Sequence, residues 1–236
     1  MSAGLGRLDR SVVAGLAAFA GLSGAEIDEI LRGAVSRRFP KGATVFDQGA
    51  EAGFFYLLLD GRLKVVQVTP AGQQVVMRYI SPGELFGIAA ALGRSDYPAT
   101  AVAAVESLAI AWETARWAPL VQRFPALAAN AMRTLGARME EAQERIREMS
   151  TERIERRIAR ALLRLVAQAG HRTEAGVAID FPITRQDLAE MTGTTLFTVS
   201  RVMSAWEEDG IVEGGRQRVV IREPHALVRI AEDLPR

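Results

Sequence analysis

The chain of 236 residues contains no cysteine. Without thiols it cannot form disulfides, hold an iron–sulfur cluster through cysteine or use a cysteine nucleophile. Histidine is nearly as scarce, because His171 and His225 are the only two. A haem site with cysteine and histidine ligands is therefore excluded, and haem bound in another way has no support in the sequence. The lack of cysteine fits a protein of the reducing cytoplasm.

The sequence also lacks a charge imbalance and a long hydrophobic run. Its 29 basic and 28 acidic residues leave a net charge of +1, so composition alone indicates no polyanionic partner. The apolar run after Arg10 is short and resembles a secretory signal, but Ser23 and Glu26 form a capping box for a following amphipathic helix. We therefore expect two small N-terminal helices on a cytoplasmic protein that does not span a membrane.

Short apolar runs separated by glycines predict a β-rich region over residues ~34–115. The Asp60–Gly61 pair indicates a hairpin between two of these runs, and Pro70–Gly72 marks the next turn. Strands at this spacing are typical of an antiparallel jelly roll or barrel. Because helical patterns precede and follow it, we expect an α+β protein with an effector-type β-roll domain over residues 1–116.

A heptad pattern predicts a long helix over residues 117–149. Apolar residues recur at alternating spacings of four and three, with charged residues beside them. This seam consists of Ala128, Met132, Leu135, Met139, Ala142, Ile146 and Met149. The seam could pack on the chain's own β-roll, but a narrow apolar stripe with charged flanks favours a parallel homodimer. The pattern stops near Thr151, which predicts a hinge and a third domain over residues 150–236.

The third domain carries the spacing of a helix-turn-helix. Thr184 suits the start of a helix, Asp187 suits its first turn, and Gly193 suits its end. A second helix is expected to begin at Thr194 or Thr195 and to turn valines inward. The run that follows it, "IVEGGRQRVVI", reads as a β-hairpin with a Gly-Gly turn, which is the wing of a winged helix-turn-helix.

Side chains of the two helices divide into two groups of expected DNA contacts. An arginine fork can read guanine in the major groove, and apolar side chains can meet thymine methyl groups. The expected base contacts are Leu196, Phe197, Ser200 and Arg201. Phosphate contacts are expected near the helix starts, where backbone N–H groups also point outward. These are Thr184, Arg185, Gln186 and Thr195.

The order of β-roll, long helix, hinge and winged helix-turn-helix, with "GELFG…YPATAVA" and "ITRQDLAEMTGTTLFTVSRVMSAWEEDGIV", closely resembles the Crp/Fnr family of bacterial transcription regulators. The resemblance implies a homodimer on a near-palindromic double-stranded DNA site, with RNA polymerase as a further partner. It implies that an effector in the β-roll switches DNA affinity. The family's phosphate-contacting Thr-Arg-Gln maps onto Thr184, Arg185 and Gln186, and its recognition arginine onto Arg201.

The resemblance also places an effector pocket around the "GELFG…YPATA" cassette. Its candidate residues are Gly83, Glu84, Gly87, Ile88, Arg94, Tyr97, Ala99 and Thr100. Ile88 stands where the cyclic-nucleotide branch has a glutamate for the ribose, and Tyr97–Pro98 stands where that branch has an Arg-Ser pair for the phosphate. A buried phosphate without its arginine is poorly compensated, so cyclic AMP is not the expected effector. Phe197 replaces a common glutamate of the recognition helix, which leaves the half-site sequence open.

Two other classes of function compete with a DNA-binding regulator. The β-roll could serve a small-molecule-binding regulatory subunit whose C-terminal helices dock a protein partner. An enzyme is not expected, because the sequence offers no histidine base, activated nucleophile or metal-ligand cluster. Adjacent carboxylates such as Glu140 and Glu141 diverge on a helix and therefore do not form a catalytic pair.

Overall fold

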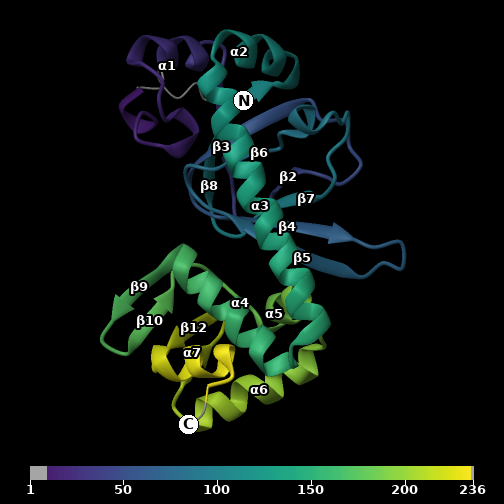
Figure 1. Cartoon of the computed structure of the whole chain (residues 1–236), viewed down its shortest axis with the longest axis vertical. Helices are drawn as coiled ribbons and strands as arrows, with labels where there is room; N and C mark the ends of the chain where they lie inside the picture. The colour runs from purple at the N-terminus through teal and green to yellow at the C-terminus, as the bar shows by residue number, and fades with distance from the viewer. Residues whose placement is uncertain (1–9, 235–236) are drawn as a thin grey trace. The chain divides into compact units, whose positions relative to one another are not determined.

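The computed structural model describes residues 10–234, which separate into two compact units. One unit joins the chain up to Ala71 with Met77–Glu140, and the other joins Gly72–Val76 with the chain from Glu141 onward. Figure 1 traces the chain through both units, and the long helix α3 (Pro125–Thr151) begins in the first and ends in the second.

From Arg10 onward, the N-terminal segment contains one α-helix where two helices were expected. Two short 3-10 turns, Arg10–Val12 and Ala17–Phe19, precede α1 (Gly24–Leu31). The predicted capping box is confirmed, because the Ser23 hydroxyl accepts a bond from the Glu26 N–H and the Glu26 carboxylate accepts one from the Ser23 N–H at 2.7 Å. Without comparable caps, the apolar run before it forms only isolated turns.

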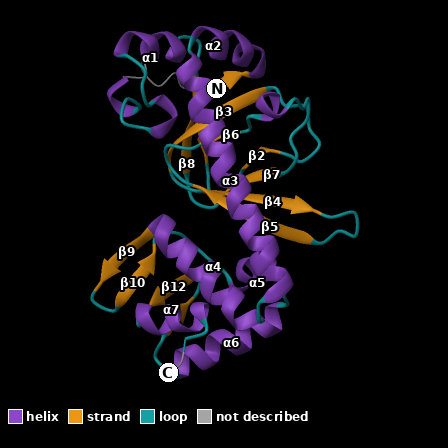
Figure 2. Ribbon diagram, in the orientation of Figure 1, coloured by secondary structure: helices purple, strands orange, loops and turns teal. Residues whose placement is uncertain are grey.

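Two four-stranded antiparallel sheets make the β-roll, which confirms the predicted class of fold (Figure 2). One sheet has the order β1-β8-β3-β6 and the other the order β2-β7-β4-β5. The strands are β1 (Val35–Phe39), β2 (Thr44–Phe46), β3 (Phe54–Asp60), β4 (Leu63–Val68), β5 (Gln74–Ile80), β6 (Leu85–Phe86), β7 (Thr100–Ala103) and β8 (Ser107–Glu113). Two 3-10 turns, Ala89–Leu92 and Thr114–Arg116, lie between and after them.

The predicted hairpin at Asp60–Gly61 is wrong. The strands on either side, β3 and β4, belong to different sheets, so the turn carries the chain from one sheet to the other. Gly61 has φ +88°, and a Cβ there would lie 2.5 Å from the carbonyl oxygen of Glu106. A tight turn packed against the segment before β8 therefore sets the path. The turn at Pro70–Gly72 does join two neighbouring strands, β4 and β5, as predicted.

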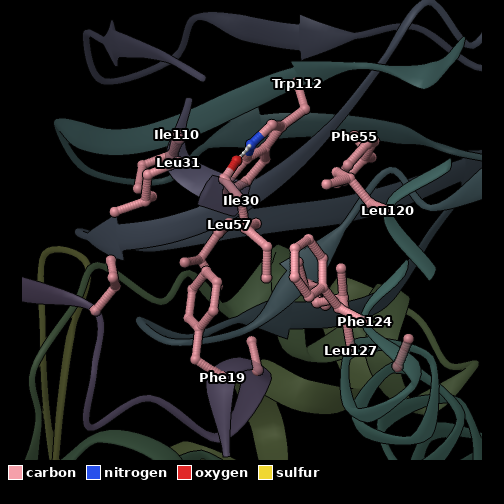
Figure 3. Packing of buried hydrophobic residues seen from close by; sticks show 14 of the residues in the cluster. Phe19, Ile30, Leu31, Phe55, Leu57, Ile110, Trp112, Leu120, Phe124 and Leu127 are labelled. Carbon is pink, nitrogen blue, oxygen red and sulfur yellow. Dashed lines mark hydrogen bonds between the residues drawn. The ribbon is translucent and has the colours of Figure 1, made fainter. Parts of the chain in front are cut away.

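The main core of the first unit joins helices to one face of the β1-β8-β3-β6 sheet. Phe19 and Ile30 from the N-terminal segment pack with Phe55 and Trp112 of the sheet and with Leu127 of α3 (Figure 3). The Trp112 indole donates a 2.8 Å hydrogen bond to the carbonyl oxygen of Ile30, which satisfies the only polar group of that buried side chain. The N-terminal segment and the start of α3 are thus fixed to the β-roll.

The heptad pattern predicted that the long helix begins at residue 117, but the helix begins later in the structure. A short helix, α2 (Trp117–Arg123), ends at Phe124, and α3 then begins at Pro125. Proline cannot donate a backbone hydrogen bond, so it suits a first helical position and disfavours a helix that runs through it. Phe124 is buried in the core, which holds the break in place.

The described part of the second unit contains the end of α3, the helices α4 to α7 and one small sheet with the order β11-β12-β10-β9 (Figure 2). Its elements are α4 (Ile154–Ala169), β9 (Gly170–Thr173), β10 (Gly176–Ile179), α5 (Arg185–Thr192), α6 (Leu196–Glu208), β11 (Val212–Gly215), β12 (Arg218–Ile221) and α7 (Pro224–Glu232). The wing forms as predicted, but not with a Gly-Gly turn. Gly214 and Gly215 lie inside β11, and the turn falls at Arg216 and Gln217, where Gln217 adopts φ 62°.

Candidate nucleic-acid interface and ligand cavity

Side-chain caps fix the start of both helices of the helix-turn-helix. The Thr184 hydroxyl accepts a 3.0 Å bond from the Asp187 N–H, and the Asp187 carboxylate accepts a 2.9 Å bond from the Thr184 N–H. Thr195 caps α6 by accepting a 3.2 Å bond from the Thr198 N–H. Gly193 takes the left-handed conformation, with φ 62°, that ends α5. The capping and the turn agree with the sequence prediction.

The inward face of α6 holds the two helices together. Val199 and Val202 are buried as expected, and Met203 and Trp206 extend the same face. Leu188 of α5 is also fully buried in this unit. The opposite face of α6 is therefore the one that remains available for a partner.

The outward face of α6 presents apolar and basic side chains together. Phe197 is 78% exposed and Leu196 is 48% exposed, which is unusual for large apolar residues at the start of a helix. Arg201 is exposed one turn further along, and Ser200 beside it is half-buried. No charged residue precedes Arg201 in α6. The four expected base-contacting residues thus lie on the first two turns of one helix.

The expected phosphate-contacting side chains already have partners in the structure. The Thr184 and Thr195 hydroxyls serve as helix caps, and the Gln186 amide donates a 2.9 Å bond to Glu190. Arg185 makes an ion pair with Glu207 of α6, in which its Nη2 lies 2.8 and 3.1 Å from the two carboxylate oxygens. This pair was not visible in the sequence, because its members are 22 residues apart on different helices.

Most of the heptad seam of α3 is exposed in the single chain. The exposed fractions are 65% for Met132, 63% for Met139, 65% for Ile146 and 40% for Met149, and Ala142 is exposed as well. Leu135 is half-buried and packs against the core of the first unit, and Ala128 is half-buried too. A row of exposed methionine and isoleucine side chains on one helix is an unpartnered apolar stripe.

A cavity of about 120 Å³ lies in the β-roll beside α3. Of the eight expected effector residues, Gly87, Ile88, Tyr97 and Ala99 line this cavity, and Gly83, Glu84, Arg94 and Thr100 lie outside its lining. Phe46, Phe86 and Leu135 add apolar walls. Two further lining residues, Arg78 and Arg138, were not identified from the sequence, where nothing distinguishes them from the other arginines.

Tyr97 closes the side of the cavity where the cassette turns. It is 3% exposed, and its ring stacks on Phe46 with the centroids 3.9 Å apart. Its hydroxyl donates a 2.6 Å bond to the carbonyl oxygen of Phe54 and accepts a 3.1 Å bond from the Phe54 N–H. Burial, with the neighbouring Tyr97, raises the pKa of Tyr56 in the same aromatic cluster, so that this phenol stays neutral. The Tyr97 side of the cavity is therefore aromatic and uncharged.

Glu84 lies between the two arginines of the cavity and offsets one of their two positive charges. The Glu84 carboxylate lies 2.7 Å from Arg78 Nη1 and 3.6 Å from Arg138 Nη2, and it accepts a 2.8 Å bond from the Ser81 N–H. Arg138 also donates to the carbonyl oxygen of Leu85. Burial alone would raise the pKa of the Glu84 carboxyl, but the adjacent arginines and the Ser81 N–H outweigh it and hold that pKa below its ordinary value. The three side chains together keep one net positive charge, with the Glu84 carboxylate bound closest to Arg78.

The other charged candidate of the cassette, Arg94, lies at the surface, and the Thr100 hydroxyl accepts a 2.9 Å bond from the Gln48 N–H. Arg94 forms an ion pair with Asp96 at 2.9 Å, and both side chains are about half exposed.

Within residues 10–234, no three histidine, aspartate or glutamate side chains gather as a metal site would require. No helix in that range is both long and apolar enough to cross a bilayer.

Two family models match the chain, one for each functional region. Residues 36–124 match a cyclic nucleotide-binding domain, and residues 156–230 match a Crp-like helix-turn-helix domain. Together they cover more than half of the chain, and they correspond to the β-roll and to the unit that holds α5 and α6.

Whole-chain relatives have the same arrangement. The cyclic AMP receptor protein of Thermus thermophilus is 33% identical over 213 residues, which cover 90% of this chain and 95% of that protein. The global nitrogen regulator of Synechococcus elongatus is 28% identical and covers 80% of this chain and 86% of its own. The crystal structure of a CRP-family transcriptional regulator from Thermus thermophilus superimposes with a TM-score of 0.73 at 27% identity, covering 84% of this chain and 97% of that one.

Proposed function

The chain belongs to the Crp/Fnr family of transcription regulators, a family that is not enzymatic, and we propose that it binds a near-palindromic DNA site as a homodimer. The observation that carries this proposal is the outward face of α6. Its first two turns combine exposed apolar side chains with one exposed arginine, on a helix whose start is capped and whose other face is buried. A helix presented in this way fits the major groove of B-DNA.

The side chains on that face have distinct roles in the proposed complex. Arg201 makes a forked contact with guanine, and Ser200 contacts the edge of a neighbouring base. Leu196 and Phe197 pack against thymine methyl groups, because apolar side chains have no hydrogen bond to offer a base edge. Backbone N–H groups at the start of α5, with Thr184, Gln186 and Thr195, contact phosphates and set the register of the protein on the duplex.

The exposed seam of α3 supports the homodimer. Pairing two copies along Met132, Met139 and Ile146 buries side chains that water otherwise surrounds. Two recognition helices then enter successive major grooves about 34 Å apart, which is why the site is nearly palindromic. In this proposal the protein works in the cytoplasm, where the chromosome lies, and RNA polymerase is its further partner.

The cavity of the β-roll is not built for cyclic AMP. Its volume of about 120 Å³ is below the roughly 300 Å³ at which small-molecule sites commonly begin. Tyr97 occupies the side where a phosphate would need an arginine, and Arg78, the nearer of the two arginines to Glu84, is already held in an ion pair with it. We therefore propose that this cavity takes a different effector or none. Titration with cyclic AMP should leave the thermal unfolding midpoint of the protein unchanged, whereas a saturating ligand would raise it.

Selection of duplexes from a random-sequence pool tests the DNA-binding function. The wild-type protein should enrich a near-palindrome, and Arg201→Ala should lose the sequence preference. Arg229→Ala removes an exposed arginine from α7 and serves as the charge-matched control. If the wild-type protein enriches no sequence, or if Arg201→Ala enriches the same one, the proposed function is wrong.

The same experiment separates the alternative, in which the chain is a small-molecule-binding regulatory subunit and its C-terminal helices dock a protein partner. That function does not need Arg201 to read a base. Arg201→Ala and the wild-type protein would therefore not differ in the DNA sequences that they select. The exposed Phe197 is compatible with either partner, which makes the arginine the discriminating position.

A further inference from the structure

The guanidinium of Arg185, the first residue of α5, is bound by side-chain and backbone groups of α6. Its Nη2 lies 2.8 Å from Glu207 Oε1 and 3.1 Å from Glu207 Oε2, and its Nη1 makes longer contacts with the Ser200 carbonyl oxygen and the Ser204 hydroxyl, at 3.5 and 3.4 Å. The Arg185 side chain is 37% exposed and that of Glu207 is 29% exposed. The guanidinium thus joins the start of α5 to three positions of α6.

The wing closes over the same pair. A Cβ built on Gly214 of β11 would collide with Glu207 Oε1 and would lie 3.7 Å from Arg185 Nη2. A larger residue at this position would displace the Glu207 carboxylate from where it now lies. The Arg185–Glu207 pair therefore lies where α5, α6 and the wing meet, and it fixes the arrangement of all three.

We infer that Arg185 serves DNA binding as a positioning residue rather than as a phosphate contact, an inference that rests on the proposed DNA-binding function. If the guanidinium turned to a phosphate, it would give up a charge-assisted pair in which Nη2 donates to both carboxylate oxygens. It would also leave the Glu207 carboxylate unpaired beside a polyanion, which is unfavourable. By holding α5 against α6 and the wing, Arg185 keeps the recognition helix at the angle at which its exposed residues reach the bases.

The two roles predict opposite effects of the isosteric change Glu207→Gln. If Arg185 positions α6, Glu207→Gln and Arg185→Gln both weaken binding of the wild-type-selected duplex, by roughly two- to tenfold, because the same pair is lost in each. The salt dependence of binding stays the same in both variants. If Arg185 contacts a phosphate, Glu207→Gln frees it and tightens binding, and Arg185→Gln lowers the slope of log K against log salt by about 0.9 per protomer.

Glu208→Gln is the matched control, because it removes an exposed carboxylate from the adjacent position of α6. It should leave DNA affinity within about twofold of the wild-type value, apart from the uniform effect of one lost negative charge. Circular dichroism at the temperature of the binding measurement establishes that each variant is folded, so that a change in Kd reports geometry and not unfolding.

A double-mutant cycle without DNA completes the test. The positioning role requires the unfolding constants of the two single variants to be non-additive by about two- to tenfold. The inference is overturned if the effects of the two single variants on the unfolding constant are additive. It is also overturned if Glu207→Gln binds DNA more tightly than the wild type, or if Arg185→Gln lowers the slope of log K against log salt. If the wild-type protein binds no duplex while the cycle shows coupling, the proposed DNA-binding function fails, and the role of the pair in DNA binding fails with it.

Discussion

The Tyr97 hydroxyl donates a 2.6 Å hydrogen bond to the carbonyl oxygen of Phe54, across 43 residues of chain. The bond fastens the end of the 83–101 cassette to the first residue of β3. The Tyr97 ring stacks on Phe46 at the same point, so the side chain fills space beside the cavity and does not open it. At Tyr97 the cassette therefore packs against the β-roll.

Tyr97→Phe should destabilise the β-roll. The substitution keeps the stacked ring but leaves the Phe54 carbonyl oxygen and N–H without the hydroxyl, which costs about 1–3 kcal/mol for buried polar groups. Urea unfolding followed by tryptophan fluorescence measures this loss, because Trp112 lies in the β-roll. Arg94→Gln, which breaks an exposed ion pair of the same cassette, should change stability by less than about 1 kcal/mol. Equal stability of the two variants would contradict the structural role of Tyr97.

Glu84 makes the stability of the β-roll sensitive to acid. Because the folded protein holds the pKa of Glu84 below its ordinary value of 4.5, the carboxylate contributes stability above that pH. This contribution is lost as the pH falls from about 4.5 through the lower pKa of the folded state. Glu84→Gln should therefore show a smaller loss of unfolding free energy between pH 6 and pH 3 than the wild type.

Urea unfolding at several pH values measures that difference. Glu106→Gln removes an exposed carboxylate of the same domain, 64% accessible, and serves as the control. If Glu84→Gln and Glu106→Gln change the pH dependence equally, the specific interaction of Glu84 with Arg78 and Arg138 does not govern it.

The sequence predicted the helix-turn-helix correctly, because the features that define it depend on residues close together in the chain. Thr184 and Asp187 form a capping box across three residues, and Gly193 ends α5 because its own backbone takes φ 62°. The helix-turn-helix could therefore be predicted with its bounds and with its buried valines. The Crp/Fnr resemblance was confirmed because it depends on several such local features in a fixed order.

Features that depend on distant partners were missed. The Asp60–Gly61 turn has the composition of a hairpin, but strand pairing is decided by the sheets, and β3 pairs with β8 and β6. Likewise, Glu84 meets Arg138 only because α3 packs beside the β-roll, and no spacing in the sequence expresses that contact. Propensity describes a turn, whereas tertiary packing decides what the turn connects.

Ile146→Asp should convert the proposed dimer into monomers. Ile146 is 65% exposed in the single chain, so a charge there does not disturb the core, whereas Leu135→Asp would also damage the core against which Leu135 packs. Loss of the second DNA-binding unit should weaken binding to a palindrome by about 100-fold or more. Sedimentation equilibrium measures the oligomeric state, and a mutant that is still dimeric would rule out the seam. Ala137→Asp places the same charge on an exposed position of α3 outside the seam and should leave the dimer intact.

Phe197 should make DNA binding depend on thymine methyl groups. The exposed start of α6 offers apolar side chains at Leu196 and Phe197, and the C5-methyl of thymine is the apolar feature of a major-groove base edge. Replacing each thymine of the selected half-site by uracil removes only that methyl, and at a contacted position it should weaken binding about fourfold, as expected for about 0.8 kcal/mol per buried methylene-sized group.

Phe197→Ala should bind the thymine and uracil duplexes equally, because the contact is already gone. Val228→Ala, which removes an exposed apolar side chain from α7, should keep the wild-type preference. Where the protein still binds after the contacted thymine is replaced by cytosine, a duplex with 5-methylcytosine at that position should be bound more tightly than one with cytosine. The 5-methylcytosine restores the methyl group without restoring thymine. Binding that is indifferent to uracil at every thymine of the half-site would show that Phe197 does not read the base, and that the specificity of α6 depends on Arg201 and the shape of the DNA.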